Sequence, residues 1–407
     1  MRTFYITKYI FLHILCFTFI TAHLYSQVKP GIDVLATQHP EIIIGKTIAL
    51  LTSKSSLDIN LTHTIDRLSK ATNIKLIVTG DVFFRETMKG DDGDEYDVLT
   101  NSKVVIYSDP SVKPTNISLS GIDALVIDIQ DIGIRYFKYL TIMAQLLELA
   151  KNSDVPVILL DRPNPIGGKI VSGFVLKLSL RSRFGVYPIP LIYGMTIGEL
   201  ALYFNKIFGI GSNLTVIGME KYNRQFSYKE TGLHWIPPFD HVNEGDTPIY
   251  YAVTGILGEM GVFSTGVGTT RPFRYILAPW IDGEILSDLI TKLNLPGLSV
   301  IPTTQTPYYG LFANKKINGV ELIITDKSKF DPFKCCVAFL KTLYDLYPQQ
   351  IPLKNHTVSE ALDILVGNEA MREGILKGQS IETICDSVKI EQTDFLNKRQ
   401  QFLIYPE

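Results

Sequence analysis

Polar and charged side chains follow three apolar, β-branched runs of this 407-residue chain, directly where each run ends. The polar segments are Thr-Gly-Asp at 79–81, Asp-Ile-Gln-Asp at 128–131 and Asp-Arg-Pro-Asn-Pro at 161–165. Charged groups are seldom buried without partners, and ligands of open parallel sheets bind outside the carboxyl ends of the strands. The segments could be surface loops or the lining of one ligand cleft, and we favour the cleft.

The second segment supplies several candidate ligand contacts. Alternation along a strand puts Asp128 and Gln130 on the same face, with Asp131 entering the turn. Asp131 could orient Arg135 or a ligand hydroxyl, or it could be a capping or turn carboxylate. Arg135 and Tyr139 lie four residues apart in a helical pattern and would share one face of a helix. The alternative for Arg135 is a structural ion pair with Asp128 or Asp131.

The third segment is a turn that two prolines stiffen. Such a turn would hold the polar groups of Asp161, Arg162 and Asn164 at fixed angles. We predict ligand contacts for these three residues. The residues that we expect in contact with one shared pocket are Asp128, Arg135, Arg162 and Asn164.

Strand-like runs alternate with helical patterns before residue 230. Strands are expected at 46–52, 74–80, 103–108, 124–130 and 155–161, and helices at 61–68, at 135–152 and after the capping box of Thr196 and Glu199. This alternation is typical of an α/β fold with a mostly parallel sheet and helices on both faces.

A region rich in Gly, Pro and aromatic residues, 230–282, shows few regular patterns and is expected to be a long functional loop that contains Glu259. A second unit follows it. Helices are predicted there at 284–294, 331–346 and 357–377, and strands near 298–303 and 318–325. We therefore predict a first domain at 27–283 and a smaller α+β domain at 284–407.

Composition narrows the classes of partner. Hydrophobic residues make up 46% of the chain and charged residues 20%, with a formal net charge of -2 and no basic run. This balance indicates a globular protein that binds no nucleic acid and does not attach electrostatically to membranes. No glycine-rich nucleotide motif follows a strand and no Cys/His spacing suits a metal, so we expect no cofactor and no metal site.

Residues 1–26 have the pattern of a secretory signal peptide, in which Arg2 and Lys8 precede an apolar run and Ser26 precedes a cleavage point at Gln27. An uncleaved anchor is the alternative. No later run is apolar enough to span a membrane, so we expect a secreted, periplasmic protein without a stable membrane anchor. Cys335, Cys336 and Cys385 are either buried thiols or include one disulfide from Cys385 to the adjacent pair.

Five strings in order complete the pattern: DIQDIGIRYFKY (128–139), LDRPNPIGG (160–168), YPIPLIYGMTIGELA (187–201), TGLHWIPP (231–238) and GTTRPFRYILAPWID (268–282). Together they resemble the exo-β-N-acetylmuramidase family (NamZ type, glycoside hydrolase family 171), formerly a domain of unknown function. The resemblance implies a Rossmann-like first domain without a dinucleotide, a smaller second domain and an active site between them. The implied substrate is N-acetylmuramic acid at the non-reducing end of peptidoglycan fragments.

The chain departs from the family pattern at several positions. Gly80-Asp81-Val82-Phe83 stands where the family has Pro-Glu-His-Gly, so Asp81 replaces the presumed catalytic glutamate. The other departures are Phe137 for tyrosine, Tyr193 for histidine, His241 for asparagine, and TGVG at 265–268 for Glu-Gly-Arg-Gly. We therefore expect a divergent member.

Glycoside hydrolysis generally needs two carboxyl groups. The resemblance makes Asp81 the first catalytic candidate, with a pKa raised by apolar Val82, Phe83 and Phe84 and no lysine partner nearby in sequence. The alternative is a strand-end turn residue. Glu259 is the second candidate, and its alternative is a solvated loop residue.

The resemblance also suggests substrate contacts. Arg135 and Tyr139 could bind a lactyl carboxylate, and His241 and Arg271 could lie at the rim of the site. Trp235 and Trp280 could stack on a sugar or belong to the core.

Two functions remain open: a secreted glycosidase acting on amino-sugar glycosides of peptidoglycan, or a non-catalytic descendant that binds cell-wall sugars. A nicotinamide-dependent oxidoreductase is excluded by the missing glycine motif. We favour the enzyme.

Overall fold

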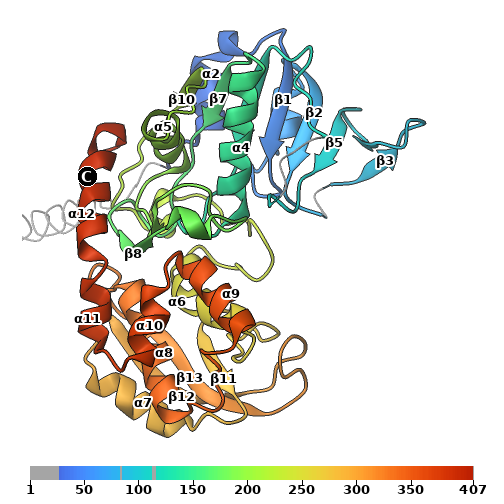
Figure 1. Cartoon of the computed structure of the whole chain (residues 1–407). Helices are drawn as coiled ribbons and strands as arrows, with labels where there is room; N and C mark the ends of the chain where they lie inside the picture. The colour runs from blue at the N-terminus through green and yellow to red at the C-terminus, as the bar shows by residue number, and fades with distance from the viewer. Residues whose placement is uncertain (1–26, 83–84, 112–115, 407) are drawn as a thin grey trace, which may run out of the picture.

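The structure is a computed structural model that describes residues 27–82, 85–111 and 116–406. The expected signal peptide and the pair Phe83 and Phe84 lie outside the described residues. Figure 1 shows an α/β region around one large sheet and, below it, a second region of helices around a smaller sheet.

The large sheet has eight strands, of which six are parallel. In spatial order they are β10 (Leu214–Ile217), β7 (Val157–Leu160), β6 (Ala124–Asp128), β1 (Thr47–Thr52), β2 (Asn73–Thr79), β5 (Lys103–Ile106) and the antiparallel pair β4 (Glu95–Asp97) and β3 (Thr87–Lys89). All five expected strands are present. The parallel strands have the order of the doubly wound dinucleotide-binding folds, and the order reverses between β1 and β6.

Both faces of this sheet are buried by helices, as alternate residues of β1 show. Ile48 and Leu50 belong to a core cluster with side chains of α2 (Gly31–Gln38) and α3 (Thr64–Leu68). Ala49 and Leu51 belong to another cluster, with α4 (Lys138–Asn152) and α5 (Ile197–Ile207). The predicted α/β architecture with helices on both faces is therefore confirmed.

The expected helix over 135–152 begins three residues later than predicted. Phe137 is the N-cap of α4, and the preceding Arg135 donates its backbone N–H to the Leu191 carbonyl over 2.8 Å. Ile134 forms an isolated bridge to Ile192, the last residue of β9 (Pro190–Ile192), which pairs with β8 (Ser172–Val175). These bonds, and a turn closed by the Phe137 N–H and the Ile134 carbonyl at 3.1 Å, keep Arg135 outside the helix, so Arg135 and Tyr139 do not share a helix face.

The expectation of a long loop at 230–282 is wrong. This region contains α6 (Thr247–Glu259) and β11 (Tyr275–Ala278). Almost every side chain of α6 up to Leu257 is buried, so the helix lacks the one-sided apolar stripe by which an amphipathic helix is recognised.

The second region is built around an antiparallel sheet with the order β11, β13 (Ile317–Ile324) and β12 (Leu298–Gln305). Its helices are α7 (Gly283–Lys292), α8 (Pro332–Leu346), α9 (His356–Val366), α10 (Ala370–Leu376), α11 (Ile381–Asp386) and α12 (Lys389–Arg399). The predicted helix over 357–377 is two helices, because Gly367 ends α9 in a left-handed conformation. The rest of the predicted elements of this region are present.

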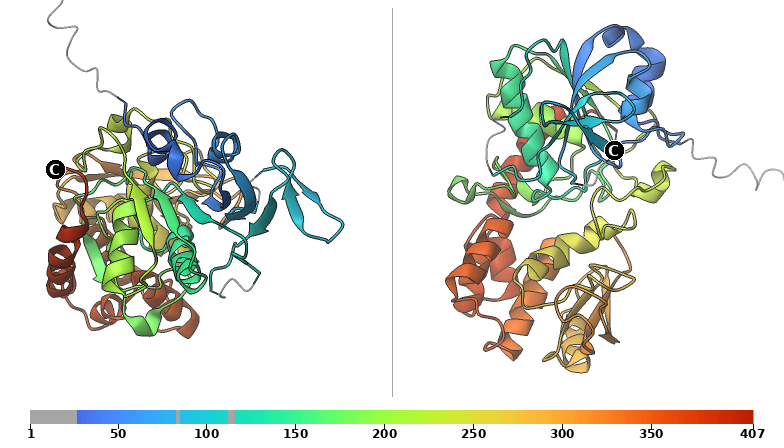
Figure 2. Two further views of the ribbon diagram at one scale, coloured as in Figure 1. Left: turned by 90° about the horizontal axis from the view of Figure 1, so that it is seen from above. Right: turned by 90° about the vertical axis from the view of Figure 1, so that its right-hand side faces the viewer.

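Short 3-10 helices complete the elements, at Pro40–Ile42, Leu178–Leu180, Tyr228–Thr231 and Gln400–Phe402. The helix α6 packs against α8 and α9, and β11 lies in the smaller sheet. These contacts place α6 and β11 with the second region, while the domain limits at 283 and 284 stay a prediction. The right-hand view of Figure 2 shows α6, drawn in yellow, within this region.

Within the described part of the chain, no helix is both long enough and apolar enough to cross a membrane. Cys335, Cys336 and Cys385 are all free thiols, which agrees with the reading as buried small side chains. Burial raises the pKa of the Cys336 thiol to about 12.

The C-terminal tail returns to the first region and binds it (Figure 1). The Ile404 N–H donates to Glu199 Oε1 over 2.8 Å, and the Arg224 N–H donates to the Pro406 carbonyl over 3.1 Å. The Tyr405 hydroxyl donates to Asp161 Oδ2 over 2.5 Å. Burial raises the pKa of Asp161 to about 7, although hydrogen bonds from Tyr405 and Thr196 oppose the rise.

This shift predicts a pH-dependent stability. Between about pH 4 and pH 7 the folded state holds a proton on Asp161 that the unfolded state has lost, so this group makes the protein less stable as pH rises. Asp161→Asn removes the titration. From pH 5 to pH 8 its free energy of unfolding should rise relative to wild type by about 2–3 kcal/mol in urea denaturation. If the free energies of unfolding of the two proteins differ by the same amount at pH 5 and at pH 8, the raised pKa of Asp161 is contradicted.

Candidate active site

A buried ion pair occupies the carboxyl edge of the large sheet where the strand order reverses. Arg162, which follows β7, donates through Nε to Asp128 Oδ1 over 2.5 Å and through Nη2 to Oδ2 over 2.8 Å. The Thr64 hydroxyl also donates to Oδ2, and the Ser56 hydroxyl donates to the Asp128 carbonyl over 2.6 Å. Both charged side chains are buried, and each is the other's charge partner.

The neighbouring candidates are also bonded to the protein interior. Asn164 donates through Nδ2 to the Met195 carbonyl over 2.8 Å and accepts from the Ile166 N–H over 3.0 Å. Asp131 accepts from the Ile132 N–H over 2.7 Å and from the Tyr193 hydroxyl. Burial raises the pKa of Asp131 to about 6. These side chains, with Asp161, stabilise the turns after β6 and β7.

Arg135 is 1% exposed, and its guanidinium donates to three backbone carbonyls. The acceptors are Phe174 at 2.9 Å, Ile189 at 3.1 Å and Leu365, on α9, at 2.8 Å. Burial lowers the pKa of Arg135 to about 9. Neither Asp128 nor Asp131 binds Arg135, because Asp128 pairs with Arg162 and Asp131 bonds to Ile132 and Tyr193. Arg135 instead joins the two regions of the chain.

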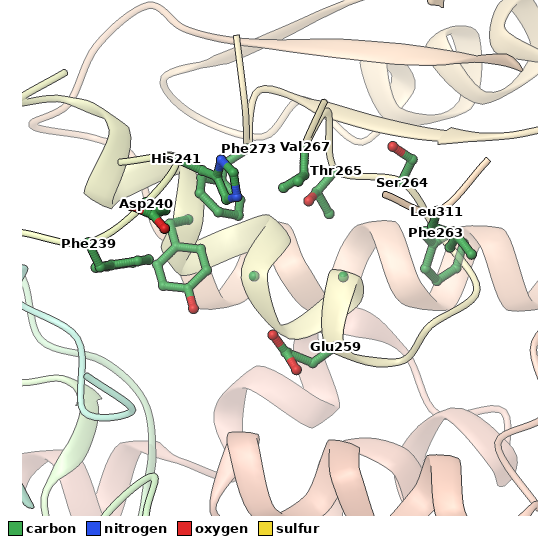
Figure 3. Close-up of a pocket in the computed structure, with 13 residues that line it drawn as sticks. Phe239, Asp240, His241, Glu259, Phe263, Ser264, Thr265, Val267, Phe273 and Leu311 are labelled. Atoms are coloured by element: carbon green, nitrogen blue, oxygen red, sulfur yellow. The ribbon is translucent and has the colours of Figure 1, made fainter. Parts of the chain in front are cut away.

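A cavity of about 410 Å³ lies beside α6, and none of the four residues expected in one shared pocket lines it. Its lining comes from the segment before α6, from α6 itself, from the loop before β11 and from the segment between β12 and β13 (Figure 3). The lining residues are Phe239, Asp240, His241, Tyr251, Gly255, Gly258, Glu259, Phe263, Ser264, Thr265, Val267, Phe273 and Leu311.

Two sequence-predicted residues, His241 and Glu259, line this cavity. Glu259 is the last residue of α6 and is exposed, so it is a helix-end residue and not part of a loop. His241 has a φ of +72°, which is uncommon for a residue other than glycine, and its Nδ1 lies 3.1 Å from the Tyr309 hydroxyl. Strained backbone of this kind is often found at functional sites.

Asp81 lies just after β2, and Lys54 connects it to the wall of the cavity. It is 7% exposed, accepts from the Lys54 N–H at Oδ2 over 3.2 Å, and its Oδ1 lies 3.6 Å from Lys138 Nζ. The Lys54 ammonium in turn pairs with Asp240 Oδ1 at 3.1 Å, and Asp240 lines the cavity. The hydrogen bond from Lys54 lowers the pKa of Asp240, and the charge of Lys138 adds to this effect.

The surroundings of Asp81 differ from the expected apolar pocket. Val82 is 58% exposed, and Phe83 and Phe84 lie outside the described residues. An N–H donor and an ammonium group face the carboxylate, which suits a nucleophile, a base or a charge stabiliser better than an acid. Both partners reach Asp81 only through the folding of the chain, because Lys54 and Lys138 are distant from it in sequence.

Tyr139 stabilises the turn that precedes Asp81. Its hydroxyl accepts from the Gly80 N–H over 2.9 Å and shares a hydrogen bond with Thr79 Oγ1 over 3.1 Å. Burial, with a smaller effect from the charge of Asp81, raises the pKa of Tyr139. Tyr139 therefore fixes the backbone turn that presents Asp81.

The other candidates lie away from this cavity or in the core. Arg271 is exposed and pairs with Glu321. Trp235 donates to the Val242 carbonyl over 2.8 Å, and Trp280 packs between Phe263 and Tyr347, as core side chains do. Among the described residues, no three His, Cys, Asp or Glu side chains converge so as to hold a metal ion.

Sequence reasoning missed Lys54, Lys138 and Asp240. Lys138 had a usable signal, because it lies directly between Phe137, a departure from the family pattern, and Tyr139. Lys54 and Asp240 carry no local signal, since their pairing spans 186 residues.

Comparison with known proteins decides the family. A family model described as the N-terminal part of exo-β-N-acetylmuramidase NamZ matches residues 48–245, and its C-terminal counterpart matches residues 249–405. The chain belongs to the NamZ family. The junction between the two matches coincides with the start of α6.

Relatives of the NamZ family cover almost the whole chain. Peptidoglycan β-N-acetylmuramidase NamZ of Bacillus subtilis (strain 168) is 35% identical over 386 residues, which are 93% of this chain and 92% of the relative. Crystal structures of two DUF1343 family proteins of Bacteroides fragilis NCTC 9343 are also similar. One has a TM-score of 0.86 at 32% identity and covers 93% of this chain and 99% of its own. The other has a TM-score of 0.74 at 25% identity, covering 94% and 100%.

The contacts of Arg135 predict a structural role. Arg135→Met leaves three buried carbonyls without their donor and should lower the free energy of unfolding by roughly 3 kcal/mol in urea denaturation. The matched variant Arg271→Met removes an arginine from a half-exposed ion pair and should cost less than about 1 kcal/mol. Sugar binding lost in Arg135→Met at unchanged stability would show instead that Arg135 is a ligand contact.

Proposed function

We propose that this protein is a secreted glycoside hydrolase that releases N-acetylmuramic acid from the non-reducing end of peptidoglycan fragments. Membership of the NamZ family over both regions and the name of the Bacillus subtilis relative support cell-wall glycoside hydrolysis. The observation that carries the proposal is the position of Asp81. A largely buried carboxylate at the end of β2 contacts the lysine that pairs with the cavity wall.

Asp81 and Glu259 are the two carboxyl groups that we assign to the reaction. Hydrolysis of a glycoside needs one carboxyl group to protonate the leaving oxygen and another to activate water or attack the sugar. Asp81 faces cationic and N–H partners, so it takes the second role. Glu259 lines the cavity, is exposed, and takes the role of the acid.

The lactyl carboxylate of muramic acid needs a cationic partner, and Arg135, from which we expected this contact, is bonded within the interior. Arg135 binds backbone carbonyls and Arg162 binds Asp128, both in the interior. Lys54 and Lys138 are each about one third exposed at the side chain and lie beside Asp81. We assign recognition of the lactyl carboxylate to Lys138, because its ammonium lies 3.6 Å from Asp81 Oδ1, donates to the Gly80 carbonyl and has a further N–H for a ligand.

A second function is a sugar-binding protein without turnover. Phe137 favours it, because this ring replaces the tyrosine of the family pattern and packs against Tyr139 and Phe239 without a hydroxyl. The exposed Val82 in place of histidine favours it too. A retained cavity with a lost catalytic group would bind muramic acid and leave it intact.

Asp81→Asn tests the first function. The variant should lower kcat for a chromogenic N-acetylmuramic acid glycoside by on the order of 10³-fold, because the charge needed in the transition state is removed. Thermal stability and sugar binding should change little. Asp288→Asn, an exposed aspartate on α7, is the matched control.

Asp81→Glu restores the residue type of the family and should retain turnover or raise it. Binding without turnover in both wild type and Asp81→Glu would establish the sugar-binding function. Equal activity in wild type and Asp81→Asn would move the catalytic carboxylate elsewhere, and Glu259→Gln would then be measured.

Lys138→Met tests substrate selection. In this variant the ratio of kcat/KM for a muramic acid glycoside to that for the matching N-acetylglucosamine glycoside should fall roughly tenfold, because the cation that binds the lactyl group is removed. Lys138→Arg keeps the charge and should keep most of the preference. Ratios of kcat/KM for the two glycosides measure this effect, and an unchanged ratio in Lys138→Met would assign the lactyl contact to another group.

A further inference from the structure

The segment between β12 and β13 presents large apolar side chains to solvent. Tyr308 is 78% exposed, Tyr309 51% and Leu311 40%. Scattered exposed apolar residues are ordinary, but three within four residues beside a cavity form a patch of the kind that contacts ligands. Tyrosine rings in particular combine an apolar face with a polar hydroxyl, which suits binding surfaces that are partly exposed to solvent.

Hydrogen bonds hold this segment in one conformation. The Tyr308 N–H donates to the Gly268 carbonyl over 2.8 Å, and the Asn314 N–H closes the segment by donating to the Pro307 carbonyl over 2.7 Å. A side chain at Gly268 would meet the Tyr309 carbonyl oxygen at 2.3 Å, so only glycine permits this close approach. Phe312 packs against the buried cluster of Tyr275, Leu277 and Ile317. The exposed rings therefore project from a fixed support.

The same segment forms part of the cavity wall. Leu311 lines the cavity, and the Tyr309 hydroxyl lies 3.1 Å from Nδ1 of His241, which also lines it. The two rings of Tyr309 and His241 are 5.7 Å apart between centroids. The exposed patch is thus continuous with the site that contains Glu259.

We propose that Tyr308 and Tyr309 form a second sugar subsite, which binds the ring attached to the sugar in the cavity. This inference rests on the proposed function and extends it from one sugar to two. A cavity of about 410 Å³ lies at the lower end of ligand-pocket sizes and suits a single substituted sugar ring. The next ring of a glycan must then lie outside it, against the rim.

The chemistry of the rim fits a pyranose ring. The C–H face of the sugar packs on the Tyr308 ring, whose exposure leaves one side free, and sugar hydroxyls bond to the Tyr309 hydroxyl beside His241. The occupant is therefore the leaving-group sugar of the glycan chain, and the patch selects chain fragments over monosaccharides.

Binding measurements in the Asp81→Asn background test this subsite with two ligands, N-acetylmuramic acid and the disaccharide of N-acetylmuramic acid β-1,4-linked to N-acetylglucosamine. Titration calorimetry should show that Tyr308→Ala weakens binding of the disaccharide about threefold to tenfold more than binding of the monosaccharide. Tyr309→Phe, which keeps the ring and removes the hydroxyl, should have a smaller effect in the same direction. Ile390→Ala, an exposed apolar residue on α12, is the control and should change neither value.

The outcomes separate this subsite from the proposed hydrolysis. Disaccharide binding that depends on Tyr308 in a wild-type protein without turnover would keep the subsite and refute the hydrolase. Turnover with an equal effect of Tyr308→Ala on both ligands, or with no effect, would refute the subsite and keep the hydrolase.

Discussion

The buried pair of Asp128 and Arg162 is the interaction on which the rest of the site depends. It joins the ends of β6 and β7, and through Thr64 and Ser56 it also fixes α3 and the segment after β1. A buried ion pair is costly to break, because the remaining charge has no water to solvate it. The carboxyl edge of the sheet is consequently a rigid platform, and this rigidity determines where Lys54 and Asp81 lie.

The second constraint is the attachment of the two regions to each other. Arg135 donates to the Leu365 carbonyl, Arg399 donates to the carbonyls of Tyr193 and Gly194, and the tail at 404–406 bonds to the first region. These buried donors cross between segments that are far apart in sequence. They set the position of α6 and of its Glu259 relative to the sheet edge. A catalytic pair drawn from both regions needs such fixed attachment, since small displacements of a catalytic group strongly reduce rate.

The sequence predicted five of the eight strands of the large sheet because their signals are local, whereas the short strands β3, β4 and β10 were not predicted. Apolar β-branched runs are buried on both faces, and the capping box of Thr196 and Glu199 is formed as expected. The helix α6 escaped recognition because it is apolar on almost all sides. Polar residues at strand ends were correctly placed at the sheet edge, but most of them bond to the interior. The sequence alone does not distinguish a buried arginine that binds backbone carbonyls from an arginine that binds the carboxylate of a ligand.

The site itself was predictable only in part for the same reason. Asp81, His241 and Glu259 came from strand position, resemblance and composition, whereas the lysines and Asp240 converge through contacts across the fold. Resemblance to the NamZ family pointed to Asp81 as the candidate catalytic carboxylate, although the family has glutamate at this position. It could not give the charges around Asp81, which set the role of that carboxylate.

We propose that the cavity holds a muramic acid ring with its anomeric carbon facing Asp81. A crystal structure of Asp81→Asn with the disaccharide of N-acetylmuramic acid and N-acetylglucosamine tests this position. We predict the muramic acid ring between residue 81 and Glu259, with its anomeric carbon nearest these two side chains. A disaccharide bound elsewhere, or bound in the cavity with its glycosidic bond remote from residue 81, would contradict the account.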